Sequence, residues 1–167
     1  MIPPEERQKF LLSIPLFAGM EPEALAELAA EMTERSYPAS GLVFREGDPG
    51  GEMFIIHSGR VEIIKHLGES REITLAKMQT RECFGEMAVV DCVARSASVQ
   101  AMKGTVLFCV KAAHLHHLFQ HRPAQYAVLI LNISRDLSRR LRALDENWAE
   151  VSRHGSLDEA MIRAMEA

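Results

Sequence analysis

The sequence predicts a mainly β protein with flanking helices, in which an antiparallel β-roll of the jelly-roll type lies between N-terminal helices and a long C-terminal helix. Between residues 42 and 110, short runs rich in Val, Ile, Phe and Thr alternate with turns that contain Gly and Asp. The segments before and after this region show helical spacing of their apolar residues instead. Many short strands joined by regular turns favour a closed or double-sheet antiparallel architecture.

The N-terminal part predicts a helix from Glu21 to Met32. Its apolar residues Leu25, Leu28 and Ala29 recur at helical spacing, and acidic side chains near its start suit the helix dipole. A Tyr-Pro-Ala-Ser-Gly run at 37–41 ends this pattern, because Pro and Gly interrupt regular structure.

The central region predicts six strands, each bounded by turn residues. Gly-rich or Gly-containing turns stand at 47–51, 58–59 and 103–104. The expected strands are 42–45, 53–57, 61–65, 73–78, 97–102 and 105–110.

After residue 110 the pattern becomes helical, with a short helix at 111–120 and a long helix from 124 to about 153. The long helix carries apolar residues at steps of three and four, close to a coiled-coil seam: Ile130, Ile133, Leu137, Leu141, Leu144, Trp148 and Val151. A small barrel cannot cover a seam of this length, so we expect a homodimer through the helix 124–153. Residues 1–153 then form one domain, and 154–167 form a short C-terminal helical tail.

The composition of the sequence limits the classes of protein to which the chain can belong. A chain of 167 residues with 47% apolar and 25% charged residues is ordinary for one soluble globular domain. No apolar run is long enough to cross a membrane and the N-terminus lacks a signal peptide, so we expect a cytoplasmic protein with no membrane partner. A net charge of −4 argues against nucleic-acid binding by this chain alone. The three cysteines lack CxxC spacing, which favours buried thiols.

Residues 84–99 carry the strongest functional signal. Gly85 permits a close backbone approach to a ligand, and the turn that begins at Glu86 presents unpaired amides that favour an anion. Arg95 supplies a planar set of donors suited to phosphate, whereas the Glu86 carboxylate can accept hydrogen bonds from sugar hydroxyls. The pattern therefore indicates a pocket for a ligand with a phosphate next to a ribose.

This segment resembles the phosphate-binding cassette of cyclic nucleotide-binding domains, such as catabolite activator protein and the regulatory subunits of cAMP-dependent protein kinase. The residues that carry the resemblance are Phe-Gly-Glu-Met-Ala at 84–88 and Arg-Ser-Ala-Ser-Val at 95–99. Glu46-Gly47-Asp48 and the run 56–63 look like two glycine turns of the same family, and the resemblance covers about residues 15–150. Ala94 departs from the pattern, because many members carry proline before the arginine.

The resemblance implies cAMP or cGMP as the ligand, with no metal. Gly85 and Glu86 would hold the ribose, and the cyclic phosphate would be held by Arg95 with Ser96. The amides of Met87 and Ala88 would also hold the phosphate, and Ile63, Leu75 and Ala97 would line an apolar wall. Asp145 on the long helix aligns with a base-contacting position, where it would accept from the amino group of adenine or guanine or remain solvated. The choice of base stays open.

The expected function is a sensor that transmits cyclic nucleotide binding through its C-terminal helix to a downstream protein that the sequence does not name. An alternative is the sensory part of a transcription regulator that lacks its helix-turn-helix domain. A purely structural dimer whose pocket has lost its ligand is a weaker alternative. We expect no enzymatic activity, because no catalytic constellation is evident.

A metal-dependent jelly-roll enzyme is disfavoured by the placement of the histidines. His57 and His66 do not form the His-x-His pattern that such an enzyme needs on its strands. His114, His117 and His121 share one helix face but lack an acidic or cysteine partner nearby in the sequence, which favours a solvated helix face.

Overall fold

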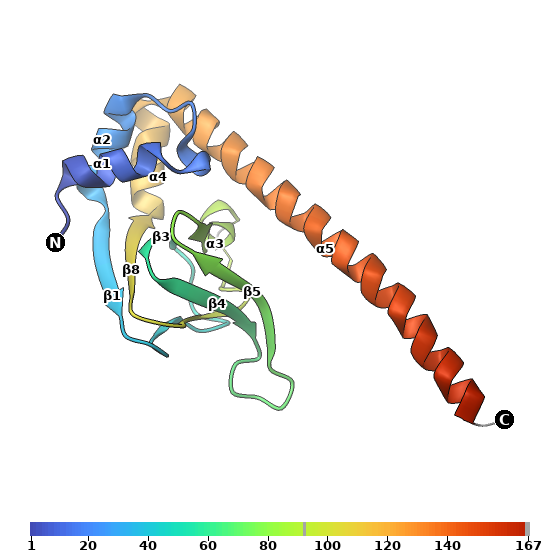
Figure 1. Ribbon diagram of the computed structural model, residues 1–167. Coiled ribbons are helices and arrows are strands. Elements are labelled where there is room, and N and C mark those ends of the chain that lie inside the picture. Colours follow the sequence, from blue (N-terminus) through green and yellow to red (C-terminus); the bar gives the residue numbers. More distant parts are fainter. Residues whose placement is uncertain (92, 166–167) are drawn as a thin grey trace.

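Two four-stranded antiparallel sheets form a β-roll, with helices packed against one sheet and a long helix extending from it (Figure 1). The computed structural model describes residues 1–91 and 93–165, and their side chains up to residue 146. One sheet has the strand order β1-β8-β3-β6, and the other has the order β2-β7-β4-β5. The strands are β1 (Thr33–Tyr37), β2 (Leu42–Phe44), β3 (Glu52–Ser58), β4 (Arg60–Lys65), β5 (Ile73–Gln79), β6 (Cys83–Phe84), β7 (Ser98–Ala101) and β8 (Thr105–Lys111).

All six expected strands are present, with bounds that differ by one or two residues. The strands β1 and β6 are additions to the prediction. The strand β1 reads Thr-Glu-Arg-Ser-Tyr and lacks an apolar alternation, and its pairing with β8 from Thr33↔Cys109 to Tyr37↔Thr105 is what makes it a strand. The strand β6 has only two residues, which is too short for a periodic signal.

The strands β3 and β8 are buried on both faces, which explains their nearly continuous apolar sequence. Met53 and Ile55 of β3 join a core beneath the helices, whereas Phe54 and Ile56 join a second core between the sheets. Successive side chains of a strand point to opposite faces, so the two cores share these strands residue by residue. Phe108 and Val110 of β8 belong to the first core and Leu107 and Cys109 to the second. The thiols of Cys83 and Cys109 are buried and free, as expected.

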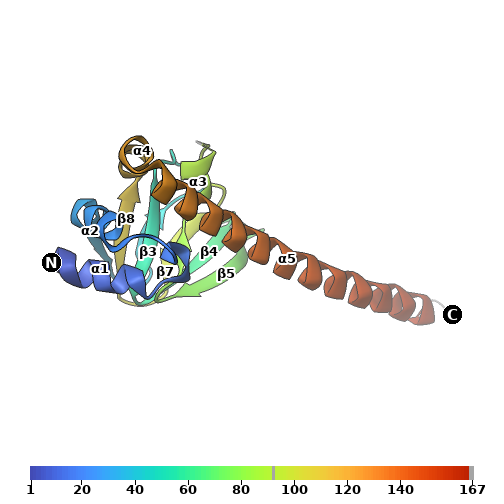
Figure 2. The ribbon, with the colours of Figure 1, turned by 90° about the horizontal axis from the view of Figure 1, so that it is seen from above.

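The helices are α1 (Pro4–Leu12), a short 3-10 turn η1 (Pro15–Phe17), α2 (Pro22–Glu31), α3 (Met87–Val90), α4 (Ala112–His121) and α5 (Pro123–Met165). Four of them begin with proline in the first turn, where its missing N–H costs nothing. Seen from above, α5 begins beside α4, passes near α3 and continues away from the roll (Figure 2). Among the described residues, no helix has the length and apolar character that crossing a bilayer requires.

The long helix does not end near residue 153. It continues without a break to Met165, so the tail expected at 154–167 is, up to residue 165, a continuation of α5. Gly155 lies within α5, because a single glycine costs a helix only about 1 kcal/mol and does not end it.

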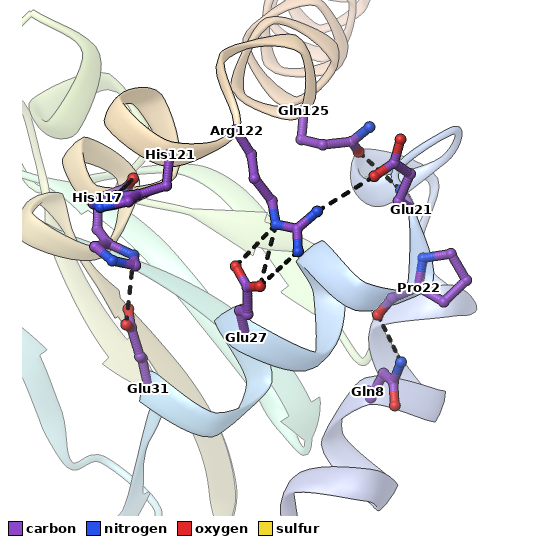
Figure 3. Close-up of polar contacts among 9 residues, drawn as sticks. All are labelled: Gln8, Glu21, Pro22, Glu27, Glu31, His117, His121, Arg122 and Gln125. Carbon is purple, nitrogen blue, oxygen red and sulfur yellow. Dashed lines mark hydrogen bonds and ion pairs between the residues drawn. The ribbon is translucent and has the colours of Figure 1, made fainter.

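Arg122, at the junction of α4 and α5, ties the start of the long helix to α2 (Figure 3). Its guanidinium donates to both carboxylate oxygens of Glu27, with its Nη2 at 2.7 Å from Oε1, and lies 3.5 Å from Glu21. The Gln125 side chain accepts from the backbone N–H of Glu21 at 2.8 Å. These contacts set the point from which α5 leaves the body of the protein.

The histidine-bearing face of α4 lies against α2 in the same region. His117 Nδ1 lies 3.7 Å from Glu31 Oε1, and His121 Nδ1 lies 3.0 Å from the His117 carbonyl oxygen (Figure 3). Within the part of the chain that the structure describes, no three His, Cys, Asp or Glu side chains gather as metal ligands.

Candidate functional site

The site is built on the segment that follows β6, where the chain turns sharply and enters the short helix α3. Gly85 adopts φ +78°, a left-handed conformation that glycine takes without strain. A Cβ at this position would meet Arg95 Nη1 at 2.7 Å and the Glu52 carbonyl oxygen at 3.3 Å. Only glycine therefore permits both the turn and the close approach of the arginine.

Arg95 lies inside the roll, with its side chain directed back toward this turn. Only 6% of the residue is exposed, and its Nη1 donates to the Gly85 carbonyl oxygen at 3.1 Å. Its Nε is buried without a hydrogen-bond partner. Burial lowers the pKa of the guanidinium, while the charges of Glu52, Asp48 and Glu86 act in the opposite direction.

No carboxylate among the described residues lies within ion-pair distance of Arg95. The ion pairs present there join other residues, including Arg35 to Glu52 at 2.7 Å and Arg140 to Glu86 at 3.0 Å. A buried arginine normally has an anionic partner, because an unpaired charge is costly to bury. This guanidinium therefore stands out among the described residues as a buried charge without a carboxylate partner.

Glu86 is the second buried charged group of the site, with 5% of the residue exposed. Burial raises the pKa of its carboxyl, and the nearby guanidinium of Arg140 opposes that shift. Arg140 comes from α5: its Nη1 lies 3.0 Å from Glu86 Oε1, and its Nη2 donates to the Cys83 carbonyl oxygen at 2.7 Å and pairs with Asp136 at 2.7 Å. The long helix is thus connected directly to the site.

The backbone holds the segment around Arg95 against the turn between β2 and β3. The Arg95 N–H donates to the Asp48 carbonyl oxygen at 2.9 Å, and the Gly47 N–H donates to the Arg95 carbonyl oxygen at 2.9 Å. The Glu46-Gly47-Asp48 turn, which resembles a glycine turn of the family, is therefore hydrogen-bonded to the backbone of Arg95.

The other predicted residues occupy less enclosed positions. Ala88 and Ala97 are buried, Ile63 is half-buried, and Met87, Leu75 and Ser96 are exposed. The backbone amides of Met87 and Ala88 donate to no other element within the described residues. The Ser96 carbonyl oxygen accepts from Lys65 Nζ at 2.8 Å. Asp145 is exposed on α5, and its role at the base stays a prediction.

Sequence reasoning missed the contact of Arg140 with Glu86. Arg140 lies three residues after Leu137 and seven after Ile133, which both contact the core. That helical spacing was the available signal for an inward-facing arginine.

The sequence matches the cyclic nucleotide-binding domain family over residues 34–122, which is more than half of the chain and includes both Glu86 and Arg95. The chain belongs to this family. The match begins in β1 and ends at the junction of α4 and α5, so it spans the whole β-roll of this cyclic nucleotide-binding domain.

Curated relatives of this cyclic nucleotide-binding domain include regulators from two bacteria. It is 31% identical over 81% of its length to a CRP-like cAMP-activated global transcriptional regulator of Mycobacterium tuberculosis, and 34% identical over 78% to a cyclic AMP receptor protein of Thermus thermophilus. The chain spans 59% of the length of each of these relatives.

Solved structures show the same fold. A cyclic nucleotide-binding domain from Methylobacillus flagellatus matches with a TM-score of 0.73 and 27% identity, covering 84% of this chain and 79% of that one. The catabolite activator protein of Thermus thermophilus matches with a TM-score of 0.69 and 33% identity, covering 83% and 63%. The β-roll with flanking helices predicted from the sequence is therefore confirmed.

Proposed function

We propose that this domain is a sensor that binds cAMP or cGMP in the β-roll and transmits binding through α5. The observation that carries the proposal is Arg95, a buried guanidinium with no ion-pair partner among the described residues, placed beside the buried carboxylate of Glu86. A 3′,5′-cyclic phosphate carries one negative charge, which one arginine neutralises without a metal ion. Glu86 has the acceptor chemistry that a ribose hydroxyl needs.

The remaining predicted residues have supporting roles in this proposal. Ser96 and the amides of Met87 and Ala88 would add donors to the phosphate, and Ile63, Leu75 and Ala97 would form the apolar wall. Asp145 would contact the base from α5. The cAMP-binding relatives favour cAMP, although no contact in the structure distinguishes adenine from guanine.

Transmission to α5 would occur through Arg140. Because Arg140 binds the same carboxylate that would accept the ribose hydroxyl, ligand binding alters its ion pair and so alters the position of α5 relative to α3. A regulatory role of this kind requires no catalytic group in the domain.

The test of the ligand proposal is calorimetric titration of the protein with cAMP and with cGMP. Arg95→Ala is expected to weaken binding by about 3 kcal/mol or more, since it leaves a desolvated phosphate without its counter-charge. Arg71→Ala, an exposed arginine in the β4–β5 turn, is the matched control and should bind as the wild type does. If Arg95→Ala and the wild type bind cAMP and cGMP with equal affinity, Arg95 does not bind the ligand.

A second candidate is that this sensor works as the nucleotide-binding half of a transcription regulator. The domain covers 93% of the sensor domain of the transcriptional regulator DNR from Pseudomonas aeruginosa, at 26% identity and a TM-score of 0.70. The test is whether the reading frame continues beyond Ala167 into a DNA-binding domain.

We also propose a homodimer through α5. Leu141 and Leu144 on this helix are 60% and 58% exposed, and both belong to the predicted seam. A second copy of the same helix would cover them.

A further inference from the structure

The guanidinium of Arg95 lies over the aromatic ring of Phe44. Neither the sequence pattern nor the proposed ligand contacts explain this contact. The guanidinium carbon of Arg95 lies 4.2 Å from the centroid of the Phe44 ring and 5.5 Å from that of Phe54. Phe44 belongs to β2 of one sheet, and Phe54 belongs to β3 of the other.

The Phe44 ring is held in place by a cluster of aromatic side chains. Its centroid lies 5.7 Å from the Phe54 ring and 6.0 Å from the Phe84 ring, and those two rings are stacked at 5.2 Å. The register of β2 against β7 shifts between Leu42 and Phe44, which brings Phe44 opposite Val99, a residue of the core between the sheets. Such irregularities redirect a side chain, here toward the arginine.

Contact with the ring leaves the binding capacity of the guanidinium free. A cation over the face of an aromatic ring is attracted by its π electrons, and the attraction is stronger where water is excluded, as it is around Arg95. The guanidinium N–H groups lie in the plane of that group, so an aromatic ring stacked on its flat face would not occupy them. The ring face and an anion can therefore engage Arg95 at the same time.

We propose that Phe44 is a positioning residue for Arg95, holding the guanidinium so that its N–H groups face the cyclic phosphate. The inference rests on the proposed nucleotide-binding function. Arg95 has no carboxylate partner among the described residues. The face of the Phe44 ring therefore also helps to stabilise the buried charge of Arg95 before the ligand arrives.

The first test varies the ring and measures the affinity for cAMP and cGMP by calorimetry. Phe44→Leu is expected to weaken binding about 5- to 30-fold, and Phe44→Tyr is expected to preserve it, because tyrosine keeps an electron-rich ring. Incorporation of mono-, di- and trifluorinated phenylalanine at position 44 should weaken binding stepwise, since fluorine withdraws electron density from the ring face at nearly constant shape. The same series at Phe10, which packs against His57 and Phe108, should leave affinity unchanged.

Affinity that stays constant through the fluorinated series, with loss only in Phe44→Leu, would show that Phe44 fills space and would overturn the proposal. A second measurement needs no ligand: a double-mutant cycle of Phe44→Leu and Arg95→Ala on urea unfolding. The effects of the two substitutions on the free energy of unfolding are expected to be non-additive. Additive effects would also overturn the proposal. Non-additivity in a protein that binds neither nucleotide would instead reject the proposed function and retain the contact between Phe44 and Arg95.

Discussion

At the scale of single residues, the site depends on how Gly85, Glu86 and Arg95 share one small volume. The absence of a Cβ at Gly85 lets the Arg95 guanidinium reach the Gly85 carbonyl oxygen. Arg95 and Glu86 carry opposite charges, yet they form no ion pair with each other, and Glu86 pairs with Arg140 instead. Among the described residues, Arg95 therefore keeps no carboxylate partner, while Glu86 has a guanidinium partner in Arg140.

Gly85→Ala should weaken cyclic nucleotide binding at least tenfold. The new methyl group collides with Arg95 Nη1, so the arginine must leave its position, and the positive φ adds a backbone cost of about 1–2 kcal/mol to folding. Gly68→Ala is the matched control, because Gly68 has a φ of +83° but nothing within 4 Å of its would-be Cβ. Both variants should lose folding stability in urea unfolding, and Gly85→Ala should lose more, because only its methyl group meets a buried side chain. Equal nucleotide affinities in calorimetry would contradict the collision.

At the scale of elements, the long helix is attached to the site by one side chain. Arg140 contacts Glu86 at the start of α3, the Cys83 carbonyl oxygen of β6, and Asp136 one turn earlier on α5. The face of α5 that contacts the core continues from Ile133 through Leu137 to Arg140. The sequence predicted the helix and its apolar face, but the partner of Arg140 depends on how β6 and α3 fold beneath it.

Arg140→Ala should lower the free energy of unfolding at pH 7 by about 1–2 kcal/mol, because it leaves the buried Glu86 carboxylate without its counter-charge. The side chain of Arg140 is 36% exposed, so the loss stays below that for a fully buried pair. Removal of Arg140 raises the pKa of Glu86 further, so the part of the penalty that comes from the unpaired carboxylate is present above that pKa and disappears as the pH falls and the carboxyl is protonated.

The measurement is urea unfolding of wild type and variant at pH 4 and pH 7. Arg139→Ala is the control, because Arg139 is more exposed than Arg140 and, among the described residues, pairs only with Asp136, at 3.6 Å. We expect it to cost less than about 0.5 kcal/mol at either pH. A penalty for Arg140→Ala that is the same at both pH values would argue against a stranded Glu86 charge.

At the scale of the whole molecule, α5 separates the protein into a body and an extension. The start of the helix is clamped to α2 through Arg122 (Figure 3) and contacts the core through Leu129 and Ile133. Farther along the helix, Leu141 and Leu144 are exposed. An extended helix with apolar side chains in water is costly, and a second copy would provide the matching surface.

Leu141→Glu combined with Leu144→Glu should convert the proposed dimer into a monomer, because two carboxylates would face their counterparts across the helix pair. Sedimentation equilibrium at micromolar concentrations measures the association. Ala143→Glu, an exposed position on another face of α5, should leave the dimer intact. A wild-type protein that sediments as a monomer at these concentrations would contradict the proposed dimer.

Much of this protein follows from local patterns in its sequence. Short runs of Val, Ile, Phe and Thr between turn residues predict six of the eight strands, and helical patterns predict α2, α4 and the first two thirds of α5. The run 84–99 carries the resemblance to the cyclic nucleotide-binding family, and the family match includes it. These features follow from residues close together in the chain, so their periodicity and turn chemistry are readable directly.

The remaining features depend on contacts between distant residues. The strand β1 exists because β8 offers it a pairing edge. Glu86 is buried beside a counter-charge because Arg140 arrives from 54 residues away, and the Arg95 guanidinium lies over the ring of Phe44, which is distant in the sequence. No periodicity encodes such pairs. They arise only when the two sheets and the long helix close around one volume, because the cost of burying a charge is set by whatever the fold brings beside it.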